Sequence, residues 1–409
     1  MLWFTCVNFS FFTFVNMTLP LYFYKTLFRN YNQFKCDQLY GRLLLEDKVH
    51  TLNHKLSHHL SIKNEGNSVE SRIITSFNLG NGPIKILVWS QMHGNESTST
   101  KAIYDFLNWV TLNSNVSNQN LTDLLQKVTL KIIPILNPDA AFKYTRFNAN
   151  NVDLNRDAKL QSQPETKVLF SIVESFQPDL CLNMHGQRTI FSAGQKPVPA
   201  TLSFLSASST KDRRISEVRL KSMAIINQMN AMLQNFIPQH VGRYNDGFNI
   251  NCTGDYLHSV GIPTVLFESG HYTNDYEREV VRKYTFLSLF KAIEFATNFR
   301  EINIDESVER NYNEIPENQE LFVDVIVENL QINQELKRVG IKYEESPEGS
   351  YVVFKPLVVE IADKSSFYGH TIIDASRTSN HSKFKDLKVG DEFPELKINE
   401  NVFVKKFKI

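Results

Sequence analysis

Residues 85–96 read KILVWSQMHGNE, and this stretch decides what kind of fold the chain adopts. Its first half belongs to an apolar run over residues 84–89, the composition of a β-strand that is buried on both faces. The run breaks at once into a polar turn that carries His93 and Glu96, three residues apart. Side chains at this spacing lie on one face of a helical turn. We therefore expect a buried strand that delivers two metal-binding side chains to its carboxyl end.

Short apolar runs alternate with longer stretches of helical periodicity over residues 73–300. The pattern predicts strands at residues 84–89, 128–135, 180–184 and 264–267, and helices at residues 100–110 and 276–299. Strands that alternate with helices are typical of an α/β domain, in which helices cover a central sheet.

A second histidine follows another of these runs, because residues 180–184 end at His185. Open α/β sheets place ligands beyond the carboxyl ends of their strands, so we expect His185 to join His93 and Glu96. Zinc takes nitrogen and carboxylate ligands in a tetrahedral shell, and a catalytic zinc keeps one position open for water. The three residues are the predicted ligands of one zinc ion per chain.

A carboxylate ends the last apolar run, where residues 264–267 lead into Glu268. A carboxylate at the end of a buried strand is costly unless it has a partner or a function. Beside a zinc site, Glu268 can act as the general base toward the water. His271 is the rival, but it lies three residues further into the loop, and we expect it to support the structure.

Two arginines lie in an amide-rich segment that follows the run at residues 128–135. Arg146 comes first, and the segment NANNVDLNRD at residues 148–157 then supplies Asn155 and Arg156. A guanidinium group pairs with carboxylate through two parallel hydrogen bonds. We expect Asn155 and Arg156 to hold an anionic end of a substrate, and Arg146 to face the reacting carbonyl.

The composition describes a globular chain without a strong electrostatic field. The chain has 409 residues, 42% of them hydrophobic, and its 44 Lys and Arg balance its 44 Asp and Glu. Nucleic acid is therefore not an expected partner. The four cysteines show no paired spacing and predict reduced thiols. Cys181, inside an apolar run, is expected to pack as a small buried side chain.

The first 24 residues carry no charged side chain and are rich in phenylalanine. The stretch could anchor in a bilayer, but Asn8, Asn16 and Pro20 interrupt it, and Met17 offers a second start. We expect a cytoplasmic protein, with membrane attachment through residues 1–24 as the alternative. Residues 25–64 look helical, and the four histidines at positions 50, 54, 58 and 59 lack a third metal donor nearby.

The pattern divides the chain into four parts. We predict an N-terminal helical extension at residues 1–64, a core domain at 65–300, a polar linker at 301–320 and a small β-rich module at 321–409.

These fragments together resemble the zinc metallocarboxypeptidases of the carboxypeptidase A type, over residues 73–299. The resemblance rests on five fragments in the family's order: the pair His93 and Glu96, then Arg146, then Asn155 with Arg156, then His185, and last Glu268. It implies that residues 65–300 form the catalytic domain, with the mixed central sheet of this phosphorylase/hydrolase-like fold. It also implies zinc ligation by the first pair and His185, carbonyl polarisation by Arg146, and a carboxylate clamp at Asn155 and Arg156.

Two positions depart from the family's pattern. Asn95 stands where an arginine often precedes the glutamate ligand, and the family's mobile tyrosine has no clear counterpart. Tyr244 is the nearest candidate by position, and the specificity pocket falls near Gly254 and Asp255.

The resemblance implies hydrolysis of a peptide bond at a free carboxyl terminus, with Glu268 as general base and a peptide as substrate. A second interpretation is a deacylase of acyl-amino acids like aspartoacylase or succinylglutamate desuccinylase, because those relatives share the His-Gly-Asn-Glu and Asp-Leu-Asn-Arg segments. A third is a protein that binds carboxyl-terminal tails through the arginines without turnover.

Overall fold

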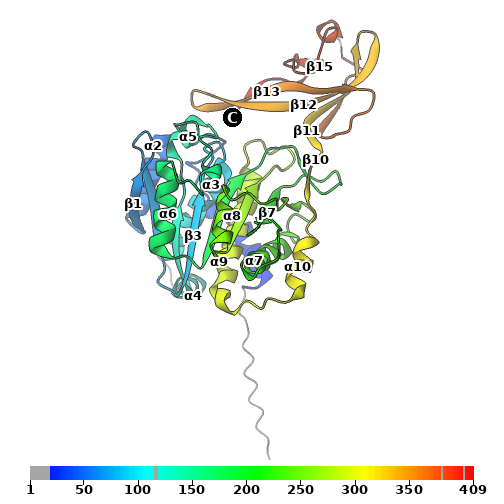
Figure 1. The fold of residues 1–409 in the computed structure, drawn as a ribbon. Coiled ribbons are helices and arrows are strands. Elements are labelled where there is room, and N and C mark those ends of the chain that lie inside the picture. The colour runs from blue at the N-terminus through cyan, green and yellow to red at the C-terminus, as the bar shows by residue number, and fades with distance from the viewer. Residues whose placement is uncertain (1–18, 115–117, 379–380, 399–400) are drawn as a thin grey trace, which may run out of the picture.

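A mixed eight-stranded sheet forms the centre of the structure, a computed structural model that describes residues 19–114, 118–378, 381–398 and 401–409 (Figure 1). The strand order is β1-β2-β4-β3-β5-β9-β7-β8, and β4, β3, β5 and β9 run parallel to their neighbours within that set. The mixed sheet expected from the resemblance is confirmed. The bounds of the strands are β1 Ser61–Asn67, β2 Ile73–Leu79, β3 Ile84–Ser90, β4 Val128–Ile133, β5 Leu180–Gly186, β7 Leu202–Ser206, β8 Val241–Arg243 and β9 Thr264–Ser269.

Helices cover both faces of this sheet. α3, α7 and α9 pack with one side of the strands, and α6 and α8 pack with the other. The bounds of the helices are α1 Leu21–Arg29, α2 Glu46–Ser57, α3 Ser97–Ser114, α4 Gln119–Lys127, α5 Pro138–Lys143, α6 Pro164–Phe176, α7 Glu217–Leu233, α8 Thr253–Ser259, α9 Glu279–Phe295 and α10 Glu306–Asn313.

Strand β3 shows why its sequence is apolar without alternation. Ile86 and Val88 belong to the core beneath α3 and α9, whereas Leu87 and Trp89 belong to the core beneath α6 and α8. All four side chains are fully buried. A strand with helices on both faces has no solvent side, which explains why the run was recognisable from the sequence.

The turn after β3 requires a glycine at one position. A Cβ on Gly94 would lie 2.1 Å from the carbonyl carbon of Ala140 in α5. Only a residue without a side chain lets the two backbones approach so closely. Gly94 therefore fixes how the turn that holds His93 and Glu96 sits against α5.

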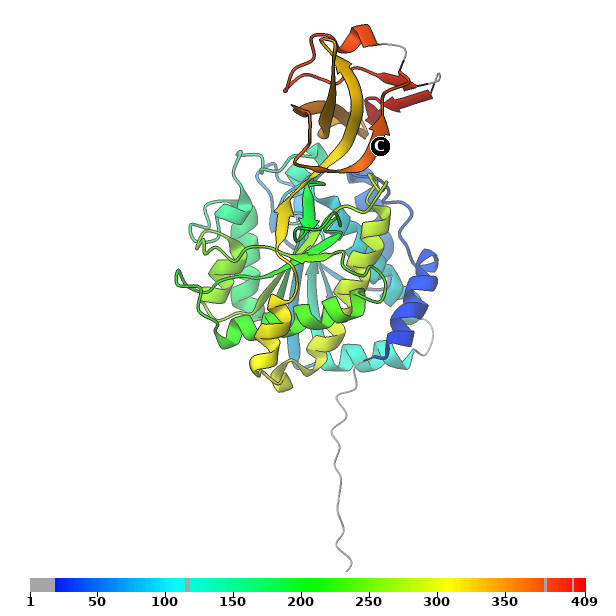
Figure 2. The ribbon, with the colours of Figure 1, turned by 90° about the vertical axis from the view of Figure 1, so that its right-hand side faces the viewer.

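The carboxyl-terminal part is β-rich, as predicted. A five-stranded sheet has the order β14-β11-β12-β13-β17, and β15 pairs with β16 in a smaller sheet. Figures 1 and 2 show this β-rich module at one end of the α/β domain. Its strands are β11 Phe322–Ile332, β12 Glu335–Glu348, β13 Tyr351–Ala362, β14 Tyr368–Asp374, β15 Leu396–Ile398, β16 Asn401–Val404 and β17 Phe407–Lys408, and β10 Asn318–Glu320 pairs with β6 Phe191–Ala193 before the module begins.

Two expected segments differ from the structure. Residues 61–64, assigned to a helical extension, belong to strand β1 at the edge of the large sheet. Within the expected linker, α10 packs against α7, and its Val308 and Tyr312 are buried. These two apolar residues, four apart, make a narrow helical stripe that a polar composition concealed. The division of the chain into domains remains our proposal.

The predicted localisation is wrong. Among the residues that the structure describes, no helix is long and apolar enough to cross a membrane. Residues 1–18 of the proposed anchoring stretch lie outside the described residues. Its remaining part runs into α1, where Tyr24 is buried and donates a hydrogen bond to Glu294 of α9 at 3.0 Å. The end of the stretch packs on the protein's own core.

Candidate active site

The three predicted metal ligands come together at the carboxyl ends of β3 and β5. In the turn after β3, His93 Nδ1 lies 2.9 Å from Glu96 Oε1. At the end of β5, His185 Nδ1 lies 2.9 Å from Glu96 Oε2 and 3.1 Å from His93 Nδ1. One ligand atom from each residue can be chosen so that all lie within 4.8 Å of one another.

These donor atoms suit a zinc ion. Two imidazoles and one carboxylate form the donor set of hydrolytic zinc sites that keep one position open. The two Nδ1 atoms point at each other, an arrangement that is unfavourable for two lone pairs and favourable around a shared cation. In the described parts of the chain, this is the one cluster of its kind.

Asp153 orients the first of these ligands. Its Oδ1 lies 2.9 Å from His93 Nε2, and its Oδ2 accepts a hydrogen bond from Arg146 Nη2 at 3.0 Å. A carboxylate on the far nitrogen of a ligating histidine fixes the ring and leaves the other nitrogen free to bind metal. Sequence analysis missed this role, although Asp153 lies two residues before Asn155 in the segment already singled out.

The local electrostatics follow from burial and these contacts. Burial alone would lower the pKa of His93, but the carboxylates of Glu96 and Asp153 raise it to about 9. Burial would raise the pKa of Glu96, yet the two histidines hold it well below its usual range. For His185, burial dominates and lowers the pKa. Glu96 is thus an ionised carboxylate within an enclosed site.

Glu268 lies directly beside this cluster. It is the residue paired with His185 in the parallel register of β5 and β9. Burial, followed by the negative charge of Glu96, raises the pKa of Glu268 well above its usual value. The structure gives its carboxylate no hydrogen-bond partner in the described residues. A half-buried carboxylate that borders a cleft without a hydrogen-bond partner is typical of a group that exchanges protons.

Arg146 reaches the same cluster from the loop after α5. Its Nη1 lies 3.4 Å from Glu96 Oε1 while its other nitrogens hold Asp153. Arg146 thus lies beside the predicted metal ligands, and its role toward a reacting carbonyl stays a prediction.

Asn155 and Arg156 lie one turn further, in the short helix η2 Leu154–Arg156. Asn155 Oδ1 accepts a hydrogen bond from Thr253 N at 3.0 Å. This contact fixes the amide and leaves its Nδ2 group for another acceptor. Arg156 donates to the carbonyl of Asn155 at 2.7 Å and has no carboxylate partner in the described chain.

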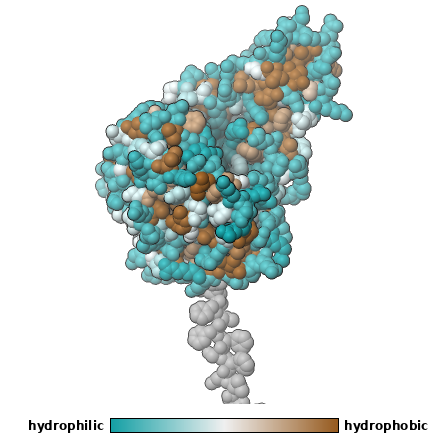
Figure 3. Space-filling view, in the orientation of Figure 1, coloured by the Kyte–Doolittle hydropathy of each residue, from teal (hydrophilic) through white to brown (hydrophobic). Residues whose placement is uncertain are grey.

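One cleft of about 920 Å³ joins most of these side chains. It is lined by His93, Glu96, Glu268, Arg146, Asn155 and Arg156 on the α/β domain, and it extends to β12 and β13 of the β-rich module. Figure 3 shows the surface hollowed between the two parts.

Comparison with known proteins places this geometry in context. The zinc carboxypeptidase family, peptidase family M14, matches residues 45–261. The chain belongs to the zinc carboxypeptidase family. The predicted resemblance is confirmed, and the family is one of hydrolases.

Individual relatives align with only part of this family member. Carboxypeptidase 2 of Trichophyton rubrum is 31% identical over 114 residues, which are 27% of this chain and 20% of that protein. Carboxypeptidase D of Mus musculus is 28% identical over 144 residues, 30% of this chain and 10% of that protein. The alignment thus spans about a fifth of the first curated relative. A metallo-carboxypeptidase structure from Burkholderia cenocepacia shares the fold with a TM-score of 0.51 at 17% identity, covering 64% of this chain and 70% of that one.

Other residues considered from the sequence lie at or near the cleft of this family member. Tyr244 lines the cleft, and burial together with the charge of Glu268 raises the pKa of its hydroxyl. Gly254 and Asp255 line it at the start of α8, and burial raises the pKa of Asp255 to about 6. His271 instead packs between Tyr276 and His370, where it supports the seating of the β-rich module.

Of the described cysteines, Cys252 lines the cleft, whereas Cys36 and Cys181 are buried away from it. Cys36, Cys181 and Cys252 are free thiols. Cys181 is fully buried in β5, and burial raises the pKa of its thiol.

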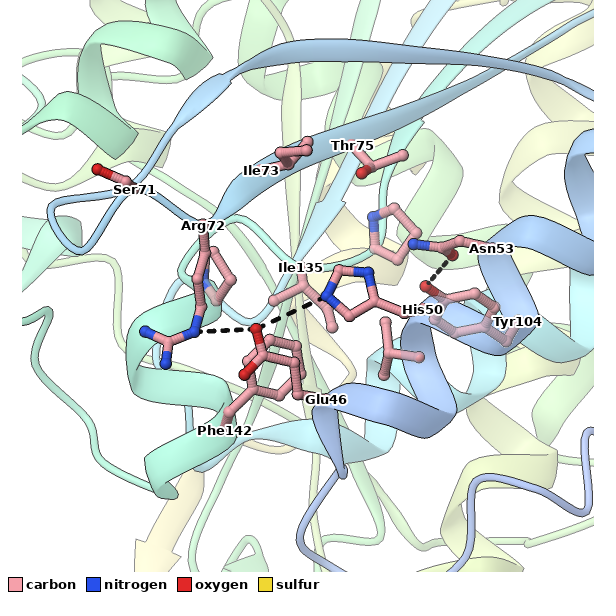
Figure 4. Close-up of a pocket in the computed structure, with 13 residues that line it drawn as sticks. Glu46, His50, Asn53, Ser71, Arg72, Ile73, Thr75, Tyr104, Ile135 and Phe142 are labelled. Carbon is pink, nitrogen blue, oxygen red and sulfur yellow. Dashed lines mark hydrogen bonds and ion pairs between the residues drawn. The ribbon is translucent and has the colours of Figure 1, made fainter.

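A second pocket lies away from the metal ligands, between α2, β2 and α5 (Figure 4). Its charged groups satisfy one another: Glu46 Oε1 lies 3.1 Å from Arg72 Nε and 3.6 Å from His50 Nε2. Tyr104 donates its hydroxyl hydrogen to Asn53 at 2.7 Å. The pocket contains none of the predicted site residues.

Proposed function

We propose that this protein is a zinc-dependent carboxypeptidase that hydrolyses the last peptide bond of a substrate with a free carboxyl terminus. The observation that carries the proposal is the shared cleft, which is lined by Arg156 and also by His93, Glu96 and Glu268. A site for a terminal carboxylate beside a site for hydrolysis selects the end of a chain over its interior.

The site residues take different parts in the proposed reaction. His93, Glu96 and His185 hold the zinc, which when bound lowers the pKa of water to about 7 and polarises a carbonyl group. Glu268 accepts a proton from the attacking water and passes it to the leaving amine nitrogen. Arg146 donates hydrogen bonds to the carbonyl oxygen as negative charge develops on it. Asn155 Nδ2 and the Arg156 guanidinium bind the terminal carboxylate.

The test begins with metal analysis of the purified protein and continues with a panel of short peptides. Each peptide is assayed with a free carboxyl terminus and with the same terminus amidated, and acyl-amino acids serve as comparison substrates. We expect stoichiometric zinc, cleavage of the free peptides and little cleavage of the amides. Turnover of acyl-amino acids in preference to peptides would contradict the proposal.

Glu268→Gln keeps the size of the side chain and removes the base. We expect kcat to fall about 10³-fold with unchanged zinc content, whereas Glu174→Gln, an exposed change on α6 outside the cleft, leaves kcat nearly unchanged.

A further inference from the structure

The β-rich module forms one wall of the active-site cleft. Lys342, Tyr343 and Glu344 of β12, with Leu357 and Val359 of β13, line the same cavity as Glu268. Figure 3 shows the module overhanging the hollow. Residues outside the α/β domain therefore contact whatever fills this part of the cleft.

Several buried contacts hold the module in that position. Glu345 Oε2 accepts a hydrogen bond from Arg42 Nη2 at 2.8 Å. Tyr276 donates its hydroxyl hydrogen to Asp324 of β11 at 3.0 Å, and the Tyr276 ring packs edge-on against Phe354 and Phe407. A module anchored by aromatic and charged contacts on its own α/β domain is a fixed wall.

The substrate's geometry decides which of its residues face this wall. A peptide held by its carboxylate at Arg156 and by its last peptide carbonyl at the metal ligands occupies the α/β side of the cleft. The residues before the scissile bond are left with the portion that β12 and β13 line. This step rests on the proposed function.

Among the described residues, the charges of the cleft leave one cation on the module without a carboxylate partner. Six arginine and lysine side chains line the cleft. Three of them have carboxylate partners: Arg42, Arg146 and Arg188. Arg156 is assigned to the terminal carboxylate. Arg278 is buried and donates to the carbonyls of Ser269 and Gln187. Lys342 remains.

Lys342 has an apolar setting on the module. Its cross-strand neighbour is Leu357, and its ammonium lies 5.5 Å from the centre of the Phe367 ring. The nearest acid along the strand, Glu344, is exposed and stands opposite Lys355, which pairs with Glu392 at 3.2 Å. The described residues give Lys342 no carboxylate. A half-buried ammonium without a counter-ion in a substrate cleft favours an anionic ligand.

We propose that Lys342 and the apolar pair Leu357 and Val359 form a subsite on the β-rich module that binds an acidic side chain in the residues preceding the scissile bond. The module is then part of substrate recognition, and the preferred substrates are peptides with a Glu or Asp shortly before the bond that is cleaved.

The test separates binding from turnover. Three peptide series share one carboxyl-terminal residue and carry Glu, Gln or Lys at each of the four positions before the scissile bond. Their dissociation constants are measured on the 409-residue chain with Glu268→Gln, and kcat/KM is measured on the parent. We expect Glu to bind about fivefold tighter than Gln at one or two positions, and the preference to shrink at high salt.

Charge reversal identifies the side chain that is responsible. Lys342→Glu is expected to prefer Lys over Glu at the same positions, and Lys342→Gln to show no preference. Lys385→Glu, on an exposed part of the module outside the cleft, should keep the parent's preference, and thermal unfolding checks that each variant is folded. An unchanged ratio of Glu to Gln affinity in Lys342→Glu would overturn the subsite. Binding preference without peptide hydrolysis by the parent would overturn the proposed function instead.

Discussion

Glu345 Oε2 accepts a hydrogen bond from the hydroxyl of Tyr144 at 2.5 Å, which ties the β-rich module to the loop that carries Arg146. Tyr144 is the left-handed residue that ends α5, and Arg146 follows two residues later. Between them, the carbonyl of Thr145 accepts a hydrogen bond from Asn95 N, next to the metal ligand Glu96. A side chain of the module thus bears on the position of Arg146.

Glu345→Gln should therefore impair catalysis from outside the α/β domain. The variant loses the charge that holds Arg42 and Tyr144, and hydrogen bonds to charged groups contribute about 1.5–3 kcal/mol. We expect kcat/KM to fall about tenfold, chiefly through kcat. Glu348→Gln is the matched control, because Glu348 lies on the same strand as Glu345 and forms an exposed ion pair with Lys408 of β17. Equal kinetics for the two variants would show that the module does not position Arg146.

Asp153→Asn should weaken metal binding. The amide can still contact His93 Nε2 but no longer supplies a negative charge, and loss of such an orienting carboxylate typically costs 10–100-fold in metal affinity. Competition with a coloured chelator measures the zinc dissociation constant. Asp212→Asn, a change at an exposed carboxylate, should leave that constant unaltered, and the same value for both variants would contradict the role of Asp153.

The two arginines should separate in their kinetic effects. Arg156→Ala removes a contact to the terminal carboxylate that exists before and during reaction, so we expect a raised KM and a modest change in kcat. Arg146→Ala removes a contact that strengthens as the oxyanion forms, so we expect kcat to fall by about 10²-fold. Steady-state kinetics with one free-carboxyl peptide compares them. If both substitutions changed kcat and KM in the same proportion, the assigned roles would be wrong.

Asp324 should make the stability of the protein depend on pH. Burial raises the pKa of this carboxyl from 3.8 to about 6. The folded state therefore holds the proton more tightly than the unfolded state, and this contribution to stability is present below about pH 4 and lost as pH rises through 6. The loss is at most about 3 kcal/mol. The amide in Asp324→Asn does not titrate, so the variant lacks this pH-dependent contribution to stability.

The measurement is urea unfolding of the parent and of Asp324→Asn at several pH values. Contributions from other groups cancel in the difference, so the free energy of unfolding of the parent should decline relative to the variant between about pH 4 and 6. A difference that stays constant across this range would contradict the assigned pKa.

The sequence predicts the large sheet well because its central strands have no solvent face. The runs at residues 84–89, 128–135, 180–184 and 264–267 correspond to β3, β4, β5 and β9, each within two residues at its ends. The sequence also predicts that four side chains lie close together, because the carboxyl ends of parallel strands meet at one edge of a sheet. They are His93, Glu96, His185 and Glu268.

The sequence does not predict β12, because most of its residues are exposed or half-buried and show no apolar alternation. Lys337, Lys342 and Glu344 interrupt any apolar pattern in this strand of 14 residues. Contacts that depend on tertiary placement are hidden for a related reason. Nothing in the sequence near Glu345 points to Tyr144, 201 residues away, and nothing near Asp153 distinguishes its contact with His93 from a solvated loop carboxylate.

The register of β9 against β5 has a consequence for how this site can change over generations. His185 and Glu268 face each other as partners in that ladder, and a slip by one residue would turn every side chain of β9 to the opposite face. A change in the pairing of these two strands would therefore remove Glu268 from its place beside His185. Any inherited insertion or deletion inside either strand is expected to abolish folding and turnover together.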